Sequence, residues 1–137
     1  MTTLVLDACA AVRIVVGPDP TSIRAAVAAA DVVITPPLFN VEVANALWKY
    51  VQAGLLTGSQ ASSRLQRAVQ LSDSQPPAAE QASSLAEALT ESCRLGHPVY
   101  DMVYLVTARR NSATLATCDQ RLAALATSQG IPTITNP

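Results

Sequence analysis

Four acidic side chains stand where their carboxylates could meet and bind a cation. Asp7 follows the short apolar run at 4–6 and precedes an apolar stretch of helical composition. Asp119 likewise separates an apolar run from an expected helix, and Asp101 begins another helix. Because the working crevice of an open α/β sheet lies at the carboxyl ends of its strands, acids at these points are expected to lie together. Glu42, on a helix face that carries further polar residues, is the fourth member of this group.

Carboxylates gathered in this way favour metal chemistry. Ionised acids repel one another strongly in a low dielectric, and a hard divalent cation removes that repulsion. Mg²⁺ and Mn²⁺ prefer oxygen ligands and keep bound waters, and such a cation can activate water and stabilise charge on a phosphodiester. The chain has only ten Asp and Glu residues, so four at such positions favour a shared site. Simpler explanations stay open, because an Asp after a strand often only caps a helix and a lone Glu on a helix is often only solvated.

Short apolar strands alternate with helices along the chain. This alternation predicts an α/β fold with a central parallel sheet of four or five strands, covered by helices on both faces, in a single domain over residues 1–137. The expected strands are 4–6, 32–35, 113–117 and the edge strand 131–135, with a brief edge strand in the connection 73–77 as a fifth. The expected helices are 8–16, 21–30, 38–53, a helix capped by Thr57 and ending near 71, 79–95, 101–110 and 120–129.

Two of the expected helices have clearly separated faces. In the helix 38–53, an apolar stripe for the core is accompanied by a polar stripe of Glu42, Asn45 and Lys49. In the helix 79–95, one face is lined by Ala82, Leu85, Ala86, Leu89 and Cys93.

The composition predicts an interface and argues against a strong electrostatic attraction to nucleic acid. Charged residues make up 14% of the chain, against about 25% in typical soluble proteins. The resulting apolar surface predicts a homodimer or a contact with a partner protein. The net charge of −1 gives no basic field, so metal ions and a few cationic side chains would have to hold RNA phosphates.

The chain is expected to be cytoplasmic. Its apolar start is broken by Asp7 and Arg13 and lacks a basic leader, so no secretion signal is expected. No apolar run reaches the roughly 18 residues of a membrane span. Cys9, Cys93 and Cys118 lack a metal-binding spacing, which favours buried, reduced thiols.

Four segments resemble the PIN domain family, and specifically the short VapC-type toxins of bacterial toxin–antitoxin pairs. The resemblance covers essentially the whole chain, and it implies a three-layer PIN-like fold. It also implies an Mg²⁺- or Mn²⁺-dependent endoribonuclease that cleaves RNA by metal-activated water and pairs with a cognate antitoxin protein. The segments, in the same order and with similar separations, are LVLDACAAV at 4–12, PPLFNVEVANALWK at 36–49, HPVYDMVYLVTARR at 97–110 and TLATCDQRL at 114–122.

The same resemblance assigns roles to particular residues. Asn45 and Thr117 are implied as polar support near the site, whereas Cys9 stands where similar proteins often have Ser or Thr. A thiol is a poorer hydrogen-bond partner for a carboxylate, which puts the surroundings of the site and the rate in doubt. The residues implied as metal-binding and catalytic are Asp7, Glu42, Asp101 and Asp119.

Other polar residues are given simpler roles. Arg13 and Lys49 are the preferred RNA contacts, because they lie on helices that carry or adjoin the acids. His97 has no Cys or His partner, so no catalytic or metal-binding role is expected for it. Tyr100 and Tyr104 are expected to pack into the core.

Two other enzyme or signalling classes are excluded by missing residues. A phosphatase of the haloacid-dehalogenase type needs a second acid where Cys9 stands, and a receiver domain needs a pair of acids near Asp7. A PIN-fold protein that binds or regulates without cleaving remains the alternative to an enzyme.

Overall fold

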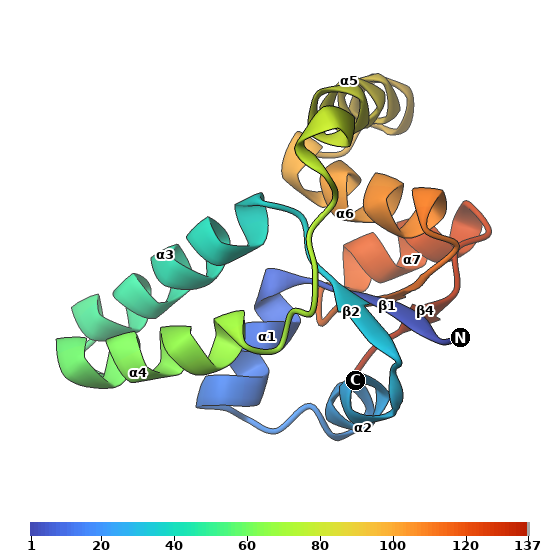
Figure 1. Cartoon of the computed structure of the whole chain (residues 1–137). Coiled ribbons are helices and arrows are strands. Elements are labelled where there is room, and N and C mark those ends of the chain that lie inside the picture. Colours follow the sequence, from blue (N-terminus) through green and yellow to red (C-terminus); the bar gives the residue numbers. More distant parts are fainter. Residues whose placement is uncertain (137) are drawn as a thin grey trace.

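The computed structural model describes residues 1–136 and shows a parallel sheet covered by helices on both faces (Figure 1). Within these residues the sheet has four strands in the order β2-β1-β3-β4, and every neighbouring pair is parallel. The predicted α/β fold with a parallel sheet is therefore confirmed. The strands are β1 (Thr3–Leu6), β2 (Val32–Ile34), β3 (Thr114–Ala116) and β4 (Thr133–Ile134).

Seven helices connect and cover these strands in the described part of the chain. Their ends fall within one or two residues of the predicted ends, and the capping box of Thr57 and Gln60 is present at the start of α4. The helices are α1 (Ala8–Val16), α2 (Thr21–Ala29), α3 (Leu38–Gln52), α4 (Gly58–Val69), α5 (Ala78–Leu95), α6 (Val99–Arg110) and α7 (Gln120–Ser128).

The order of the strands creates a crevice beside the central pair. The chain leaves β1 toward β2 on one side, whereas β3 lies on the other side of β1 and leads outward to β4. Because crossovers between parallel strands are right-handed, the two directions place α1 and α2 on one face and α6 and α7 on the other (Figure 1). The carboxyl ends of β1 and β3 therefore lie at a point where the strand order reverses, which is where open α/β sheets form binding sites.

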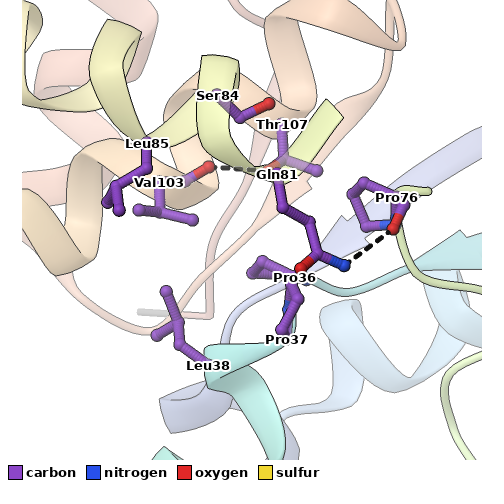
Figure 2. Close-up of a pocket in the computed structure, with 9 residues that line it drawn as sticks. All are labelled: Pro36, Pro37, Leu38, Pro76, Gln81, Ser84, Leu85, Val103 and Thr107. Atoms are coloured by element: carbon purple, nitrogen blue, oxygen red, sulfur yellow. Dashed lines mark hydrogen bonds between the residues drawn. The ribbon is translucent and has the colours of Figure 1, made fainter. Parts of the chain in front are cut away.

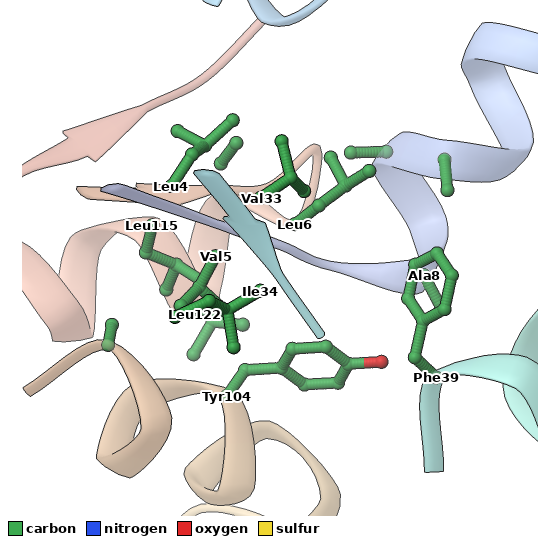
Figure 3. Packing of buried hydrophobic residues seen from close by; sticks show 14 of the residues in the cluster. Leu4, Val5, Leu6, Ala8, Val33, Ile34, Phe39, Tyr104, Leu115 and Leu122 are labelled. Atoms are coloured by element: carbon green, nitrogen blue, oxygen red, sulfur yellow. The ribbon is translucent and has the colours of Figure 1, made fainter. Parts of the chain in front are cut away.

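The core is centred on β1 and α6. Val5 and Leu6 of β1 are fully buried, and so is Tyr104 of α6. Figure 3 shows the Tyr104 ring extending from α6 toward Ala8 and Phe39, at the end of β1 where the acids are found. The tyrosine prediction is half right, because Tyr104 is in the core whereas Tyr100 is exposed.

The last strand lies at an edge of the sheet, as predicted, but it is shorter than the expected strand 131–135. β4 contains only two residues and ends the sheet on one side. The connection after α4 supplies a single bridge between Ile34 and Ser74, not a fifth strand. No helix within residues 1–136 combines the length and the apolar character needed to cross a membrane.

The apolar face of α5 does not belong to the core. Leu85 and Leu89 are 55% and 56% exposed, and the buried residues of the helix are Ser84, Ala88 and Glu91. Cys93 is exposed as well, which corrects the expectation that all three cysteines are buried.

The reason for this orientation lies in the neighbouring helix. α6 ends in Arg109 and Arg110, and their guanidinium groups form ion pairs with Glu87 and Glu91 of α5 at N–O distances of 2.6 to 3.0 Å. Hydrogen-bonded charge pairs of this kind are satisfied only when the acidic face of α5 turns toward α6. The apolar face of α5 is therefore left uncovered, and the two arginines act as cross-helix partners and not only as charges at a helix end.

Candidate metal-binding site

The structure brings the four predicted acids to one pocket. The pocket has a volume of about 270 Å³ and lies at the carboxyl ends of β1 and β3. Its position is fixed by the sheet, because the N–H of Asp7 continues the ladder by donating to the Ala116 carbonyl at 3.0 Å. The residues that line it are Asp7, Ala8, Cys9, Glu42, Asn45, Ala46, Lys49, Asp101 and Asp119.

Asp7 is the most buried of the four acids, with 6% of its surface exposed. The Thr117 hydroxyl donates to its Oδ2 at 2.6 Å, and the Cys9 thiol donates to the same oxygen at 3.1 Å. Burial raises the pKa of Asp7, and the charge of Asp119 raises it further, although these hydrogen bonds oppose the shift. The ionised form of Asp7 is therefore held in place by its neighbours, although burial disfavours its charge.

Glu42 approaches Asp7 from α3. It occupies the predicted polar stripe of that helix, and the Tyr104 hydroxyl donates to its Oε1 at 2.7 Å. Burial raises the pKa of Glu42, and the charges of Asp7 and Asp101 add to the increase. The alternative of a simply solvated helix residue does not describe this partly buried, hydrogen-bonded side chain.

Asp101 lies in the first turn of α6, where the helix dipole favours a carboxylate. Its Oδ2 is 2.9 Å from Nε2 of His97. Burial is the largest cause of the raised pKa of Asp101, followed by the charges of Asp7 and Asp119. These three acids thus influence one another through the same pocket.

Asp119 is the N-cap of α7. Its Oδ1 accepts the backbone N–H groups of Arg121 at 2.9 Å and Leu122 at 3.2 Å. The capping explanation is therefore correct for Asp119, and it is compatible with a second role, because the same residue also lines the pocket.

Each of the four acids has one carboxylate oxygen engaged in the hydrogen bonds described above. Within residues 1–136, the second oxygen of each carboxylate can therefore face a cation or its waters. No three Asp, Glu, His or Cys side chains in this range lie close enough to form a compact metal cage. The engaged oxygens are Oδ2 of Asp7, Oε1 of Glu42, Oδ2 of Asp101 and Oδ1 of Asp119.

Of the residues predicted to support the site or contact RNA, some line the pocket and others do not. Asn45 and Lys49 line the pocket, and Thr117 contacts Asp7 directly. Arg13 does not line the pocket, because its side chain donates to the Pro18 carbonyl at 3.3 Å and to the Cys118 sulfur at 3.5 Å.

Cys9 is a hydrogen-bond donor in this structure and not a nucleophile. Burial strongly raises the pKa of its thiol, and the nearby charge of Asp7 raises it further. The protonated thiol therefore persists at neutral pH and can donate to the Asp7 carboxylate.

Sequence reasoning missed the roles of His97 and Tyr104. His97 lies just before α6, four residues ahead of Asp101, and Tyr104 lies within α6, three residues after Asp101. Residues three or four apart share one face of a helix. His97 and Tyr104 each contact a different acid of the pocket. That spacing was the available signal, but it does not reveal that Tyr104 reaches across to an acid on α3.

Comparisons with known proteins agree with this fold. Ribonuclease VapC3 from Pyrobaculum aerophilum is 35% identical over 126 residues, which cover 88% of this chain and 92% of that protein. The crystal structure of PAE2754 from Pyrobaculum aerophilum superposes with a TM-score of 0.70 at 23% identity, covering 96% of this chain and 83% of that one. VapBC2 from Rickettsia felis, solved bound to a DNA fragment from its promoter, gives a TM-score of 0.69 at 14% identity, with 98% of both chains covered.

The family model agrees with the fold as well. The PIN domain model matches residues 4–134, which include all four acids of the pocket and every segment that carried the resemblance. This chain belongs to the PIN domain family.

Proposed function

We propose that this protein is a divalent-metal-dependent endoribonuclease and the toxin of a toxin–antitoxin pair. The observation that carries the proposal is the pocket in which Asp7, Glu42, Asp101 and Asp119 meet, each with one oxygen left for a cation or its waters. The relative named Ribonuclease VapC3 supports the reaction, since it is 35% identical over most of both chains.

The donor set of the pocket fits Mg²⁺ or Mn²⁺. Carboxylate oxygens are the ligands these ions prefer. Burial and the charges of the neighbouring acids raise the pKa values of Asp7, Glu42 and Asp101, and a bound cation would offset both effects. Asp7 and Asp101 would hold one or two ions directly, and Glu42 and Asp119 would complete the shell directly or through water. Once bound, the cation would lower the pKa of water and neutralise charge on the phosphodiester.

The remaining residues of the pocket would position the RNA. Lys49 lines the pocket and carries the positive charge that a phosphate requires, and Asn45 lies one helical turn before it on α3. Arg13 contacts Cys118 and does not line the pocket, so we propose that it contributes to a more distant phosphate. With the Cys9 thiol protonated, water is the attacking group, and in-line attack leaves a 5′-phosphate and a 3′-hydroxyl.

The assay uses end-labelled RNA with Mg²⁺, with EDTA, and with the Asp7→Asn variant. We expect cleavage only by the native protein with metal, and a loss of at least about a hundredfold in Asp7→Asn, a weakening typical of lost electrostatic stabilisation. Glu80→Gln, on the exposed start of α5, is the matched control and should cleave normally. Cleavage that survives EDTA, or fragments ending in a cyclic phosphate, would contradict the proposal. Metal-dependent RNA binding without cleavage would favour the non-catalytic alternative.

We propose that the protein forms a homodimer through the uncovered face of α5. This face adjoins an apolar pocket of about 200 Å³, and Figure 2 shows Leu85 of α5 beside Val103 and Leu38 at that pocket. Its neighbouring charges on Glu87, Arg109 and Arg110 are already paired within the chain. A second copy fits such a surface, because a two-fold axis pairs an apolar stripe with itself and leaves no charge unmatched.

The second proposed partner is a cognate antitoxin. Four acids around one pocket favour a basic side chain, which would neutralise the site without metal. An apolar segment of that partner would fit the groove between α3 and α4, where Trp48 is exposed. Helix α3 lines this groove and also carries Glu42, so the groove adjoins the acidic pocket's own helix.

A further inference from the structure

The single histidine of the chain is held at the entrance to α6. Gly96 caps the end of α5 in the left-handed conformation, with φ 66°, and Pro98 is the residue immediately before α6. A residue before proline is disfavoured in the helical conformation, so His97 stays outside the helix. From there its side chain reaches forward to Asp101, four residues later.

The contact between His97 and Asp101 is sheltered and specific. The His97 side chain is 9% exposed, and its Nε2 lies 2.9 Å from Oδ2 of Asp101. When Asp101 is ionised its carboxylate can only accept, and Nε2 of His97 is then the donor. Within residues 1–136, this is the hydrogen bond found for the imidazole ring, and no side chain caps the start of α6.

We propose that His97 is a positioning residue that fixes the carboxylate of Asp101 for cation binding. The imidazole occupies Oδ2 and leaves Oδ1 as the oxygen available to a cation. Without this contact, the like charges of Asp7 and Asp119 would favour rotation of Asp101 away from the pocket. A histidine here orients a carboxylate that would bind the metal, whereas in the usual arrangement a carboxylate orients a metal-binding histidine. The inference rests on the proposed function only in taking a divalent cation as the ligand.

The test compares two substitutions of His97 that keep a side chain of similar size, of which only one can donate a hydrogen bond to Asp101. His97→Leu fills the same sheltered space without a hydrogen bond, whereas His97→Gln places an amide N–H near the position of Nε2. Mn²⁺ binding to the full chain is measured by electron paramagnetic resonance at fixed pH. We expect His97→Leu to bind Mn²⁺ about ten- to a hundredfold more weakly, the usual effect of losing a group that orients a ligand, and His97→Gln to regain most of the affinity. Thermal unfolding without metal should show both variants folded.

A double variant and a spectroscopic measurement separate positioning from packing. In an Asp101→Asn background, His97→Leu should cause little further loss, because the two residues act through one contact. The ring nitrogen signals of the only histidine are unambiguous in NMR spectra. They should show the Nε2-protonated tautomer in the native protein and a mixture of tautomers in Asp101→Ala.

The outcomes distinguish this inference from the proposed function. Native affinity in a folded His97→Leu variant, or failure of His97→Gln to restore binding, would overturn the positioning role and leave the metal site intact. Absence of Mn²⁺ binding by the native protein, or equal binding by Asp101→Asn, would overturn both.

Discussion

Asp7 has the least access to solvent of the four acids, so burial raises its pKa and the donors around it offset part of that rise. Thr117 and Cys9 both donate to Oδ2, and their hydrogen bonds lower a pKa that burial has raised. Of the two, the thiol is the weaker donor, because sulfur holds its proton in a longer and less polar bond. A small change at Cys9 should therefore alter the pKa of Asp7.

We predict that Cys9→Ser shifts the acid side of the pH–activity profile to lower pH. A hydroxyl donates more strongly to the ionised form of Asp7 and therefore lowers its pKa, so the metal-binding form persists to lower pH. A net gain near 1 kcal/mol for such a bond corresponds to a shift on the order of half to one pH unit. Mn²⁺ titrations at several pH values and cleavage rates measure the shift.

Cys9→Ala is the control for this change. It removes the donor, so the acid side of the profile should move in the opposite direction, to higher pH. Identical profiles for the serine, alanine and native proteins would show that the group at residue 9 does not influence the ionisation of Asp7.

At the scale of elements, the sequence predicted the strands and helices but not every face. The polar stripe of Glu42, Asn45 and Lys49 was predicted correctly, and all three residues line the pocket. Such a stripe can be read from the sequence because it depends only on helical periodicity and on the types of the residues within one helix. The exposure of the apolar face of α5 did not follow from the sequence, because periodicity identifies an apolar stripe but does not say which neighbour the helix meets. In the folded chain that neighbour is the cationic end of α6, which pairs with Glu87 and Glu91.

The roles of His97 and Tyr104 escaped prediction for a related reason. A hydrogen bond from Tyr104 to Glu42 joins residues 62 apart in sequence and depends on how α6 crosses α3. The cluster of acids was predictable because strand ends and helix starts meet at a known edge of the sheet. The donors that orient those acids depend on packing angles, which no local pattern contains.

We predict that Leu89→Glu on α5 converts the protein from a dimer to a monomer. A charge placed on the uncovered face would have to be desolvated in the interface, and against a two-fold partner it would also meet its own copy. Light scattering coupled to size-exclusion chromatography measures the mass.

Leu55→Glu is the matched control for this prediction. Leu55 is 68% exposed, against 56% for Leu89, and lies in the connection between α3 and α4, not on α5. Its substitution should leave the dimer unchanged. A native protein that is monomeric at high concentration, or an unaltered dimer in Leu89→Glu, would contradict the proposed interface.

At the scale of the whole molecule, the acids that serve function oppose stability. The pKa values of Asp7, Glu42 and Asp101 are raised in the folded chain, so the fold favours their protonated forms. Each such group makes the free energy of unfolding fall as pH rises from its ordinary pKa through its raised value. At neutral pH the metal-free protein therefore carries the full cost of burying these ionised carboxylates and of their mutual repulsion.

We predict that Mn²⁺ raises the melting temperature of the native protein at neutral pH. A ligand at a hundred times its dissociation constant contributes about 2.7 kcal/mol, which corresponds to a rise of several degrees in a chain of this size. In EDTA, Asp101→Asn should melt at a higher temperature than the native protein, because one of the repelling charges is gone while the side chain still accepts from His97.

Calorimetry with and without Mn²⁺ checks both parts of this prediction. Asp101→Asn should gain much less from Mn²⁺ than the native protein does, and Glu80→Gln should behave as native in both conditions. A variant that melts lower than the native protein in EDTA would show that Asp101 stabilises the fold, and the proposed conflict between charge and stability would be wrong.

The distance in sequence between Asp7 and Asp119 has a consequence during synthesis. The pocket needs β3 to pair with β1, and both the strand and the last acid come late in the chain. A nascent polypeptide therefore has no complete site until the segment containing Asp119 has left the ribosome and joined the first strand. If the protein cuts RNA, the message and ribosome that produce it are spared while translation of this segment is unfinished.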